Sequence, residues 1–287
     1  MHKNIYSIIK VFLILTCEKD LFLIEFYSIL FQKSEVYFMK KIAIVTGATG
    51  GLGQEFIKLL STYNLDEIYA LGRNKDKLLM LKEKYNVIPY EIDLSSRKEI
   101  ENFVNSLKDV QIEYLINNAG YAKFCAYNDL SCEESINMID VNVVAVVEMC
   151  LKCIPFMKKG SHIINIASQA SFQPLPYMNI YSATKAFVRN YTRALNVELK
   201  EKGIIATAVC PGWIETSLYD RGDVHAKKAP TRFLHKAKPY NVAKKALKDC
   251  YKDISVYSFY VKFCHLMSKI LPQKMMMKIW LKQQKIK

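Results

Sequence analysis

A glycine-rich loop between an apolar strand and an amphipathic helix most narrows what this chain can fold into. Lys41–Thr46 read KIAIVT, a short β-rich run; GATGGLG follows, and QEFIKLLSTY continues in a helical pattern. A strand, a glycine turn and a helix in this order form a dinucleotide-binding unit. Gly47, Gly51 and Gly53 have the spacing GxxxGxG, which permits a tight turn and the close approach of a pyrophosphate to the helix N-terminus. The alternative, a plain strand-to-helix turn, is the weaker interpretation.

Strand and helix patterns continue to alternate along the chain. Such βαβα order is typical of a parallel sheet with helices on both faces, joined by right-handed crossovers. The sequence therefore predicts an α/β fold, a Rossmann-like, doubly wound parallel sheet in a single domain. We expect further strands at 66–71, 86–92, 113–116, 160–168 and 204–210, and helices at 75–85, 97–107 and 241–251.

The end of the second expected strand bears on the choice between NAD and NADP. An acidic residue there would hold the ribose 2′-hydroxyl of NAD, whereas a nearby arginine accommodates the 2′-phosphate of NADP. Gly72 and Arg73 stand at this turn, without a carboxylate. The sequence therefore favours NADP(H), with NAD as the less favoured cofactor; a solvated surface charge is the alternative role for Arg73.

Residues 168–185 hold the strongest candidates for catalysis. Tyr181 and Lys185 are four residues apart, so on a helix they share one face, and a nearby cation lowers the pKa of a phenol. Ser168 lies at the carboxyl end of the fifth expected strand, and ligands of open α/β sheets bind at these strand ends. Asn142 lies in an apolar helical run, where it is either a satisfied core amide or a member of a proton network.

Taken together, the motifs TGATGGLG, NNAG at 117–120, Asn142, Ser168, YSATK at 181–185 and Pro211–Gly212 resemble those of the short-chain dehydrogenase/reductase family. The match is to the branch with a GxxxGxG cofactor loop and a YxxxK active site, and it covers about Lys41 to Tyr257. The resemblance implies one Rossmann-like domain with a parallel sheet of about seven strands. It also implies a cytoplasmic, homo-oligomeric enzyme, a dimer or tetramer, that interconverts a carbonyl and an alcohol of a small molecule with NAD(P).

The resemblance also implies a role for each candidate residue. Tyr181 would be the acid in ketone reduction and the base in alcohol oxidation, and Ser168 would donate to the substrate carbonyl. Lys185 would hold the nicotinamide ribose and lower the pKa of Tyr181, and Asn142 would anchor a proton-relaying water. The implied cofactor contacts are Gly47, Thr49, Gly51, Leu52, Gly53, Arg73, Asp93, Leu94, Asn118, Ala119, Gly120, Tyr181, Lys185, Pro211, Gly212, Ile214 and Thr216.

Each of these residues also has a purely structural alternative, and the whole protein has a non-catalytic one. Ser168 could serve as a strand-end cap, Asn142 as a core amide, and Tyr181 with Lys185 as a surface pair. A non-catalytic NADP(H)-binding sensor or membrane-surface protein could use the same fold, since fold alone does not fix function. The joint presence of Ser168, Tyr181 and Lys185 favours the enzyme.

Two segments of the sequence bear on the class of substrate. Residues 217–240 are expected to form a lid over the substrate. Its basic residues suit an anionic substrate such as a 3-oxoacyl thioester of a phosphorylated carrier. The alternative is that the segment is only a solvated loop. Residues 259–287 form an apolar and basic helical tail, which suits a substrate wall, a subunit contact or a membrane interface. We expect a reductase for a hydrophobic ketone or 3-oxoacyl compound. The basic lid residues are Arg221, Lys227, Lys228, Arg232, Lys236 and Lys238.

Residues 1–38 differ in character from the catalytic domain expected at 39–258. The apolar runs at 5–16 and 21–31 are interrupted by Lys10 and Glu25, and neither reaches the roughly 20 residues that cross a bilayer. No signal cleavage site follows the first run. We expect an N-terminal extension, either a mistaken start before Met39 or a weakly structured membrane-surface segment.

The net charge of +14 is compatible with an anionic partner. The lysines are scattered through the chain rather than clustered, so no nucleic-acid partner is expected. Cys150 and Cys153 form the only CxxC, inside an apolar helical run and without a second pair or nearby histidines. We therefore expect buried small hydrophobic residues in a reducing cytosol and no metal site.

Overall fold

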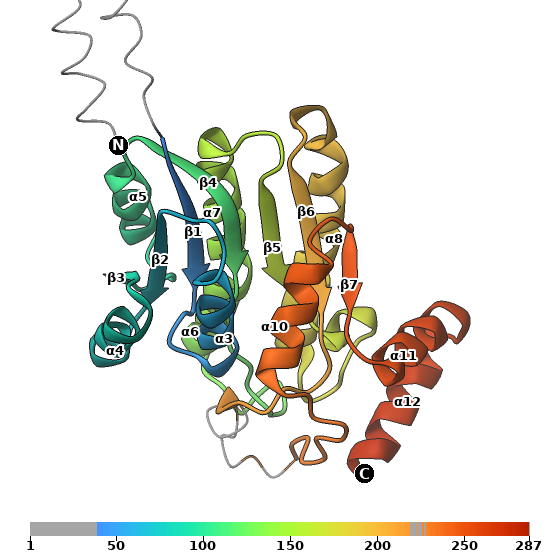
Figure 1. Ribbon diagram of the computed structural model, residues 1–287. Helices are drawn as coiled ribbons and strands as arrows, with labels where there is room; N and C mark the ends of the chain where they lie inside the picture. The colour runs from blue at the N-terminus through green and yellow to red at the C-terminus, as the bar shows by residue number, and fades with distance from the viewer. Residues whose placement is uncertain (1–38, 219–221, 223–225, 227, 287) are drawn as a thin grey trace, which may run out of the picture. The chain divides into compact units, whose positions relative to one another are not determined.

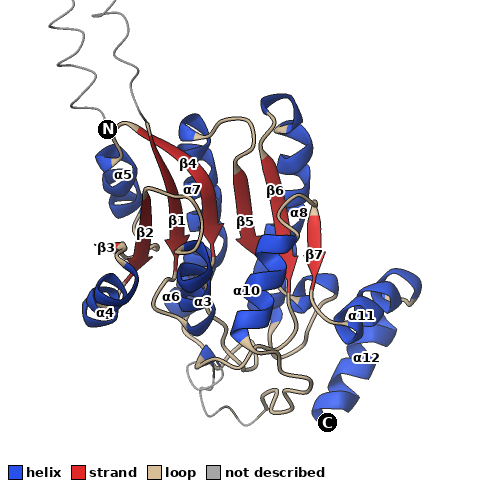
Figure 2. Ribbon diagram, in the orientation of Figure 1, coloured by secondary structure: helices blue, strands red, loops and turns tan. Residues whose placement is uncertain are grey.

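The computed structural model describes residues 39–218, 222, 226 and 228–286. Among them, seven parallel strands form one sheet in the order β3-β2-β1-β4-β5-β6-β7 (Figures 1 and 2). The predicted α/β class and doubly wound parallel sheet are confirmed. The strands are β1 (Lys40–Thr46), β2 (Glu67–Gly72), β3 (Ile88–Glu91), β4 (Val110–Asn117), β5 (His162–Ile166), β6 (Ile205–Cys210) and β7 (Ile254–Val256).

Helices cover both faces of this sheet (Figure 2). Successive side chains of a strand point to opposite faces, so Ile42 and Ile44 join the core shared with α5, α7 and α8. Ala43 and Val45 join the core shared with α3, α4 and α10. The helices are α3 (Gly51–Leu60), α4 (Lys75–Tyr85), α5 (Arg97–Ser106), α6 (Cys132–Ile139), α7 (Ala145–Cys153), α8 (Asn179–Glu198), α10 (Pro239–Lys248), α11 (Phe259–Ile270) and α12 (Gln273–Gln284).

Helix α3 begins at Gly51, inside the glycine motif, three residues before the helical pattern expected from Gln54. The first turn of a helix leaves backbone N–H groups without partners inside the helix. Because α3 starts within the loop, these donors lie beside the carboxyl end of β1, where a ligand of an open α/β sheet binds.

A short π-helix, η1 (Asp140–Val144), interrupts the long helical segment between α6 and α7. Asn142 lies at its centre and is fully buried. Single-turn π segments inside α-helices occur frequently at functional sites.

Farther along the same segment, Cys150 and Cys153 of α7 are buried in the hydrophobic core, which is the environment predicted for them.

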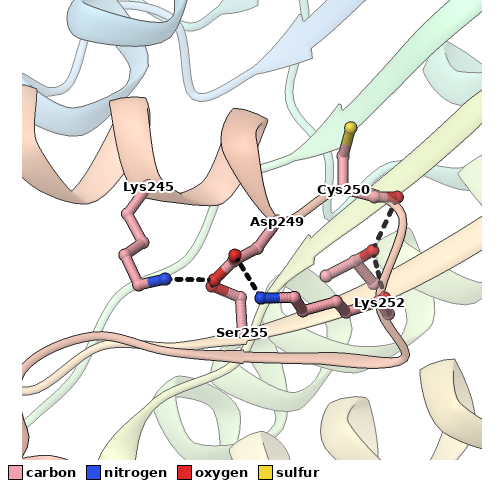
Figure 3. Close-up of polar contacts among 6 residues, drawn as sticks. Lys245, Asp249, Cys250, Lys252 and Ser255 are labelled. Carbon is pink, nitrogen blue, oxygen red and sulfur yellow. Dashed lines mark hydrogen bonds and ion pairs between the residues drawn. The ribbon is translucent and has the colours of Figure 1, made fainter.

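A buried carboxylate fixes the end of α10 to β7, and a hydroxyl of β6 holds the turn between them (Figure 3). Asp249 accepts hydrogen bonds from Lys245 Nζ (2.6 Å), Lys252 Nζ (2.7 Å) and Ser255 Oγ of β7 (2.8 Å). Thr207 of β6 donates to the backbone oxygens of Cys250 and Lys252 at 3.0 and 2.6 Å. This cluster holds the turn that leads from α10 into β7.

Two helices follow β7, as predicted, and Pro272 separates α11 from α12. Figure 1 places both beyond the β7 edge of the sheet, with α12 extending towards the side on which the strands end. No helix in the described part of the chain is long and apolar enough to cross a membrane. Residues 1–38 and the lid residues Arg221 and Lys227 lie outside the described residues.

Candidate active site

A cavity of about 510 Å³ runs along the carboxyl ends of the strands. The glycine loop forms one part of its wall, and segments that follow β2, β3, β4, β5 and β6 form the rest. Of the residues expected from the sequence, those that line it are Gly47, Thr49, Gly51, Leu52, Arg73, Asp93, Leu94, Asn118, Ala119, Gly120, Ser168, Tyr181, Lys185, Pro211, Gly212, Ile214 and Thr216. Gly53 and Asn142 are not among the lining residues.

Two glycines of the loop are required by close backbone packing. Gly47 has φ +61°, and a Cβ there would lie 2.8 Å from Ala119 Cα. A Cβ on Gly53 would lie 2.2 Å from the oxygen of Gly47. Gly53 therefore lets α3 pack against its own loop, which agrees with the tight turn expected from the glycine spacing.

Thr46 and Asn118 tie the loop to the end of β4. The hydroxyl of Thr46 accepts hydrogen bonds from the backbone N–H groups of Asn118 and Ala119, both at 3.0 Å. The side-chain amide of Asn118 donates to the oxygens of Thr46 (3.0 Å) and Gly47 (3.1 Å). Thr46 was missed as a site residue, although a hydroxyl directly before the first glycine was a signal for it.

The end of the cavity beside β2 is basic. Arg73 and Lys77 both line it; Lys77 belongs to the first turn of α4 and was not predicted. Burial acts to raise the pKa of Asp93, but hydrogen bonds from Ser95 and the positive charge of Arg73 outweigh it, so this pKa is lowered. The carboxylate is therefore held ionised beside Arg73.

The opposite end of the cavity holds Tyr181 and Lys185, on the first two turns of α8. Both side chains are buried, which excludes the surface-pair alternative. Lys185 Nζ donates to the oxygen of Ile166 at 2.8 Å and lies 5.8 Å from the centre of the Tyr181 ring. The shared helix face predicted from their spacing brings the two groups together.

Burial dominates the acid–base properties of this pair. It lowers the pKa of Lys185 to about 8, because the charged ammonium is desolvated. It raises the pKa of Tyr181, against the opposing effect of a hydrogen bond with Ser168. The sequence had led us to expect that Lys185 lowers the pKa of this phenol, whereas desolvation raises it in this structure.

Ser168 follows β5 and reaches both the substrate side and the backbone. Its hydroxyl accepts a hydrogen bond from Ala170 N at 3.1 Å and so caps the 3₁₀ turn Gln169–Phe172. The strand-end cap considered from the sequence is therefore real. It does not exclude a second role, since Ser168 also lines the cavity next to Tyr181.

Asn142 has all its amide groups satisfied. Its Oδ1 accepts from Tyr121 N (3.0 Å), and its Nδ2 donates to Tyr121 O (2.9 Å) and Thr184 Oγ1 (3.2 Å). These are the contacts of the core-amide alternative. A Cβ on Gly120 would lie 2.9 Å from Asn142 Oδ1 and 3.3 Å from Lys185 Nζ, so Asn142 also fixes the wall beside the lysine.

A second cavity, of about 340 Å³, meets the first at Ser168, Tyr181, Gly212 and Trp213. Its other walls come from the segment after β5 and from the two C-terminal helices. None of the described residues that line it is charged. The residues from α11 and α12 are Tyr260, Phe263, Cys264, Met267, Met276, Ile279, Trp280 and Gln283.

The described part of the lid packs against α12. Gln284, which is buried, accepts from Arg232 N at 2.9 Å and donates to Arg232 O at 3.1 Å. Phe233 lies 4.9 Å from Trp213 between ring centres, and Trp213 lies 6.4 Å from Trp280. Of the basic lid residues, the four that the structure describes line neither cavity: Lys228, Arg232, Lys236 and Lys238.

Comparisons with known proteins agree with this geometry. The sequence profile of the family described as short chain dehydrogenase matches residues 41–224. An uncharacterized oxidoreductase of Staphylococcus epidermidis is 30% identical over 196 residues, 66% of this chain and 84% of that protein. One of Staphylococcus aureus is 33% identical over 187 residues, covering 62% and 80% of the two chains. A closed form of serine dehydrogenase complexed with NADP+ superposes with a TM-score of 0.66 at 28% identity, covering 75% of this chain and 93% of that one.

Proposed function

The chain belongs to the short chain dehydrogenase family, whose profile matches most of it, and is an oxidoreductase of that family; we propose that it uses NADP(H) to interconvert a hydrophobic carbonyl compound and its alcohol. One observation carries this proposal. The long cavity with the glycine loop and the uncharged cavity meet at Ser168 and Tyr181, so two ligands would come together beside the phenol that could donate the proton.

The residues of the first cavity fit a dinucleotide. The loop offers the tight turn at Gly47 and the N-terminus of α3, which suit a pyrophosphate. Lys185 would hold the nicotinamide ribose at the other end. NADPH, when bound there, supplies the hydride.

Three side chains would handle the charge and the proton. Ser168 would donate a hydrogen bond to the carbonyl oxygen and stabilise the negative charge that develops on it. Tyr181, whose raised pKa keeps it protonated at neutral pH, would then donate its proton to that oxygen. In the reverse direction the phenolate would take the proton back. Asn142 would support the proton relay by fixing the backbone of Tyr121.

The preference for NADP over NAD rests on the basic end of the first cavity. Arg73 and Lys77 line it, and both suit a 2′-phosphate. The serine dehydrogenase noted above, 28% identical to this chain, was solved with NADP+, which supports the proposal.

The second cavity supports a hydrophobic substrate. It is bounded by aromatic and sulfur-containing side chains, and the part the structure describes contributes no charge. A ketone or the apolar chain of a 3-oxoacyl compound suits such walls better than an anionic head group does. We further propose that the protein is a homo-oligomer, a dimer or tetramer, in the cytoplasm. Sedimentation analysis would test the oligomeric state.

The first test is NADPH oxidation by purified protein against a panel of apolar ketones and 3-oxoacyl thioesters. We expect turnover with wild type, and a loss of about 10²- to 10⁴-fold in kcat for Tyr181→Phe with NADPH binding retained. Tyr191→Phe is the matched control, because Tyr191 is on the same helix but lines neither cavity. Near wild-type activity of Tyr181→Phe would refute the assignment. Tight NADPH binding without turnover of any compound would favour the non-catalytic sensor.

A further inference from the structure

We propose that the outer face of α11 and α12 docks on an anionic membrane surface, so that the second cavity can take apolar substrates directly from the lipid. The docking itself does not depend on the proposed function. Only the loading of substrate rests on it.

An apolar stripe runs along the outer face of α11. Phe259, Phe263, Leu266 and Ile270 are spaced by four, three and four residues, which places them on one side of a helix. They are 86%, 51%, 52% and 62% exposed. Met275 and Ile279 add exposed apolar side chains on α12. Several exposed apolar side chains on one helix face indicate a site of interaction.

The charge of the same segment has one sign. From Tyr257 to Lys287 the chain contains seven lysines and no aspartate or glutamate. None of the ion pairs found among the described residues uses one of these lysines. The six lysines whose side chains the structure describes are all exposed: Lys262, Lys269, Lys274, Lys278, Lys282 and Lys285.

An apolar stripe among unpaired lysines fits a membrane interface better than a second copy of the chain. Two acid-free surfaces of the same sign repel each other, whereas anionic lipid attracts both the lysines and the apolar side chains. Each lysine near an anionic surface contributes about fivefold in affinity at physiological salt. Helices α11 and α12 have 12 residues each, fewer than the roughly 20 that cross a bilayer, so on a membrane they would lie along its surface.

The cavity opens within this face. Phe263 and Ile279 line the second cavity and are about half exposed, 51% and 46%, so they stand at its mouth. Met276 and Trp280 line it from inside and are buried. A membrane that covers the stripe would therefore lie against the entrance through which an apolar compound reaches Tyr181.

The test is co-sedimentation of the full chain with vesicles. We expect binding to phosphatidylcholine vesicles that contain phosphatidylserine, weaker binding to phosphatidylcholine alone, and a decrease as salt is raised. A triple variant, Phe259→Ser with Leu266→Ser and Ile270→Ser, removes stripe residues that line neither cavity. Its affinity for the anionic vesicles should fall at least about tenfold, because three exposed apolar side chains that the lipid would bury are removed.

Two matched variants make the result specific. Lys262→Gln with Lys269→Gln and Lys278→Gln should lower the affinity by about fivefold per lysine at physiological salt and much less at high salt. Tyr127→Ser with Val197→Ser, at exposed apolar positions outside the tail, should leave binding unchanged. Binding of the stripe variant equal to wild type overturns the proposal. So does a stripe variant that changes from oligomer to monomer without any change in vesicle binding, since the face is then a subunit contact.

The loading step has its own readout. The stripe variant should retain turnover of a water-soluble ketone and lose turnover of an apolar ketone supplied in anionic vesicles. If neither wild type nor variant turns over any ketone while wild type still sediments, the proposed function fails and the docking stands. Equal turnover of the vesicle-borne ketone by both proteins refutes loading from the membrane.

Discussion

The ammonium of Lys185 stands in an unusual position for a lysine, since it is buried and donates to a backbone oxygen rather than to a carboxylate. Desolvation lowers its pKa to about 8. An exposed lysine keeps its charge throughout the neutral range, whereas this one loses it just above that range. The site therefore contains a cation that is sensitive to mild alkali.

This sensitivity predicts a fall in activity as pH rises through about 8. Below that pH Lys185 is charged and can hold the ribose; above it the lysine is neutral, while Tyr181, with its raised pKa, is still protonated. The value of kcat/KM for NADPH reports the enzyme without cofactor and is the quantity to measure. Lys185→Arg keeps its charge at all these pH values, so its lower activity should not show the decline. An identical decline in that variant would assign the pKa to another group.

The exposed side chain of Arg73 tests the cofactor preference. Arg73→Asp should raise the KM for NADPH about 10- to 100-fold, because a charge-assisted contact to the 2′-phosphate becomes a repulsion. The KM for NADH should change little or fall. Lys75→Asp makes a like change in charge two residues away, at a position that does not line the cavity. If both variants have the same effect, Arg73 acts only as a general surface charge.

Helix α12, the second helix of the C-terminal tail, is held against the segment that follows β5 by a tryptophan. Trp280 is buried in the second cavity wall, and its indole N–H donates to Pro176 O at 3.0 Å. The lid packs on the same helix through Gln284 and Arg232. Loss of α12 packing would therefore disturb both the wall of the second cavity and the described part of the lid.

We predict that Trp280→Ala raises the KM for apolar ketones at least about tenfold, since the substrate would lose contact with the indole and each buried CH₂ group contributes about 0.8 kcal/mol. Trp280→Phe retains most of the apolar wall but loses the hydrogen bond to Pro176, so its KM should lie between the values of wild type and Trp280→Ala. Steady-state kinetics with both variants measure this. A Trp280→Ala enzyme with unchanged KM for every apolar ketone, and an unaltered circular dichroism spectrum, would show that substrates do not use this wall.

The sequence was informative wherever a local pattern determines a local structure. The glycine loop, the helix face of Tyr181 and Lys185, and the strand end at Ser168 follow from spacing and strand order, and these residues come together as predicted. The π-helix at Asn142 did not follow, because a one-residue insertion in a helical ladder leaves no mark in the hydrophobic pattern. Strand β7 was not placed, since its three residues are too few to show an alternation.

Contacts between distant segments were also beyond a single sequence. The Met-rich tail was compatible with a substrate wall, a subunit contact or a membrane interface. Only the fold shows that Met276 and Trp280 face the second cavity while Phe259 and Ile270 face outwards. The basic lid suggested an anionic substrate, yet its described lysines and Arg232 line neither cavity.

At the scale of the whole molecule, the Asp249 cluster in Figure 3 fixes the turn through which the chain passes from α10 into β7. The Asp249 side chain is 5% exposed. Burial acts to raise its pKa, but the hydrogen bonds from Lys245, Lys252 and Ser255 outweigh it and lower the pKa from 3.8 to about 2. The folded-state pKa is thus below the unfolded one, so the cluster stabilises the fold above about pH 4 and ceases to do so as pH falls through about 2.

The free energy of global unfolding should therefore depend on the ionisation of the Asp249 carboxylate. Asp249→Asn is expected to lower the free energy of unfolding by roughly 2 kcal/mol at neutral pH, with the difference from wild type shrinking towards pH 2. Urea titrations at several pH values measure it. Asp253→Asn is the control, because Asp253 forms an exposed ion pair with Arg193, and such pairs contribute little. A difference that stays constant down to pH 2 would mean that the ionisation of Asp249 is irrelevant.

The wall shared by the two cavities at Ser168, Tyr181, Gly212 and Trp213 has a thermodynamic consequence. A ligand in either cavity would order side chains that the other ligand contacts, so the two binding equilibria are linked through the same atoms. Linkage is reciprocal. The factor by which a bound dinucleotide changes the affinity for the carbonyl compound equals the factor by which that compound changes the affinity for the dinucleotide. A substitution at Trp213 that alters this coupling factor would therefore alter it equally in both directions.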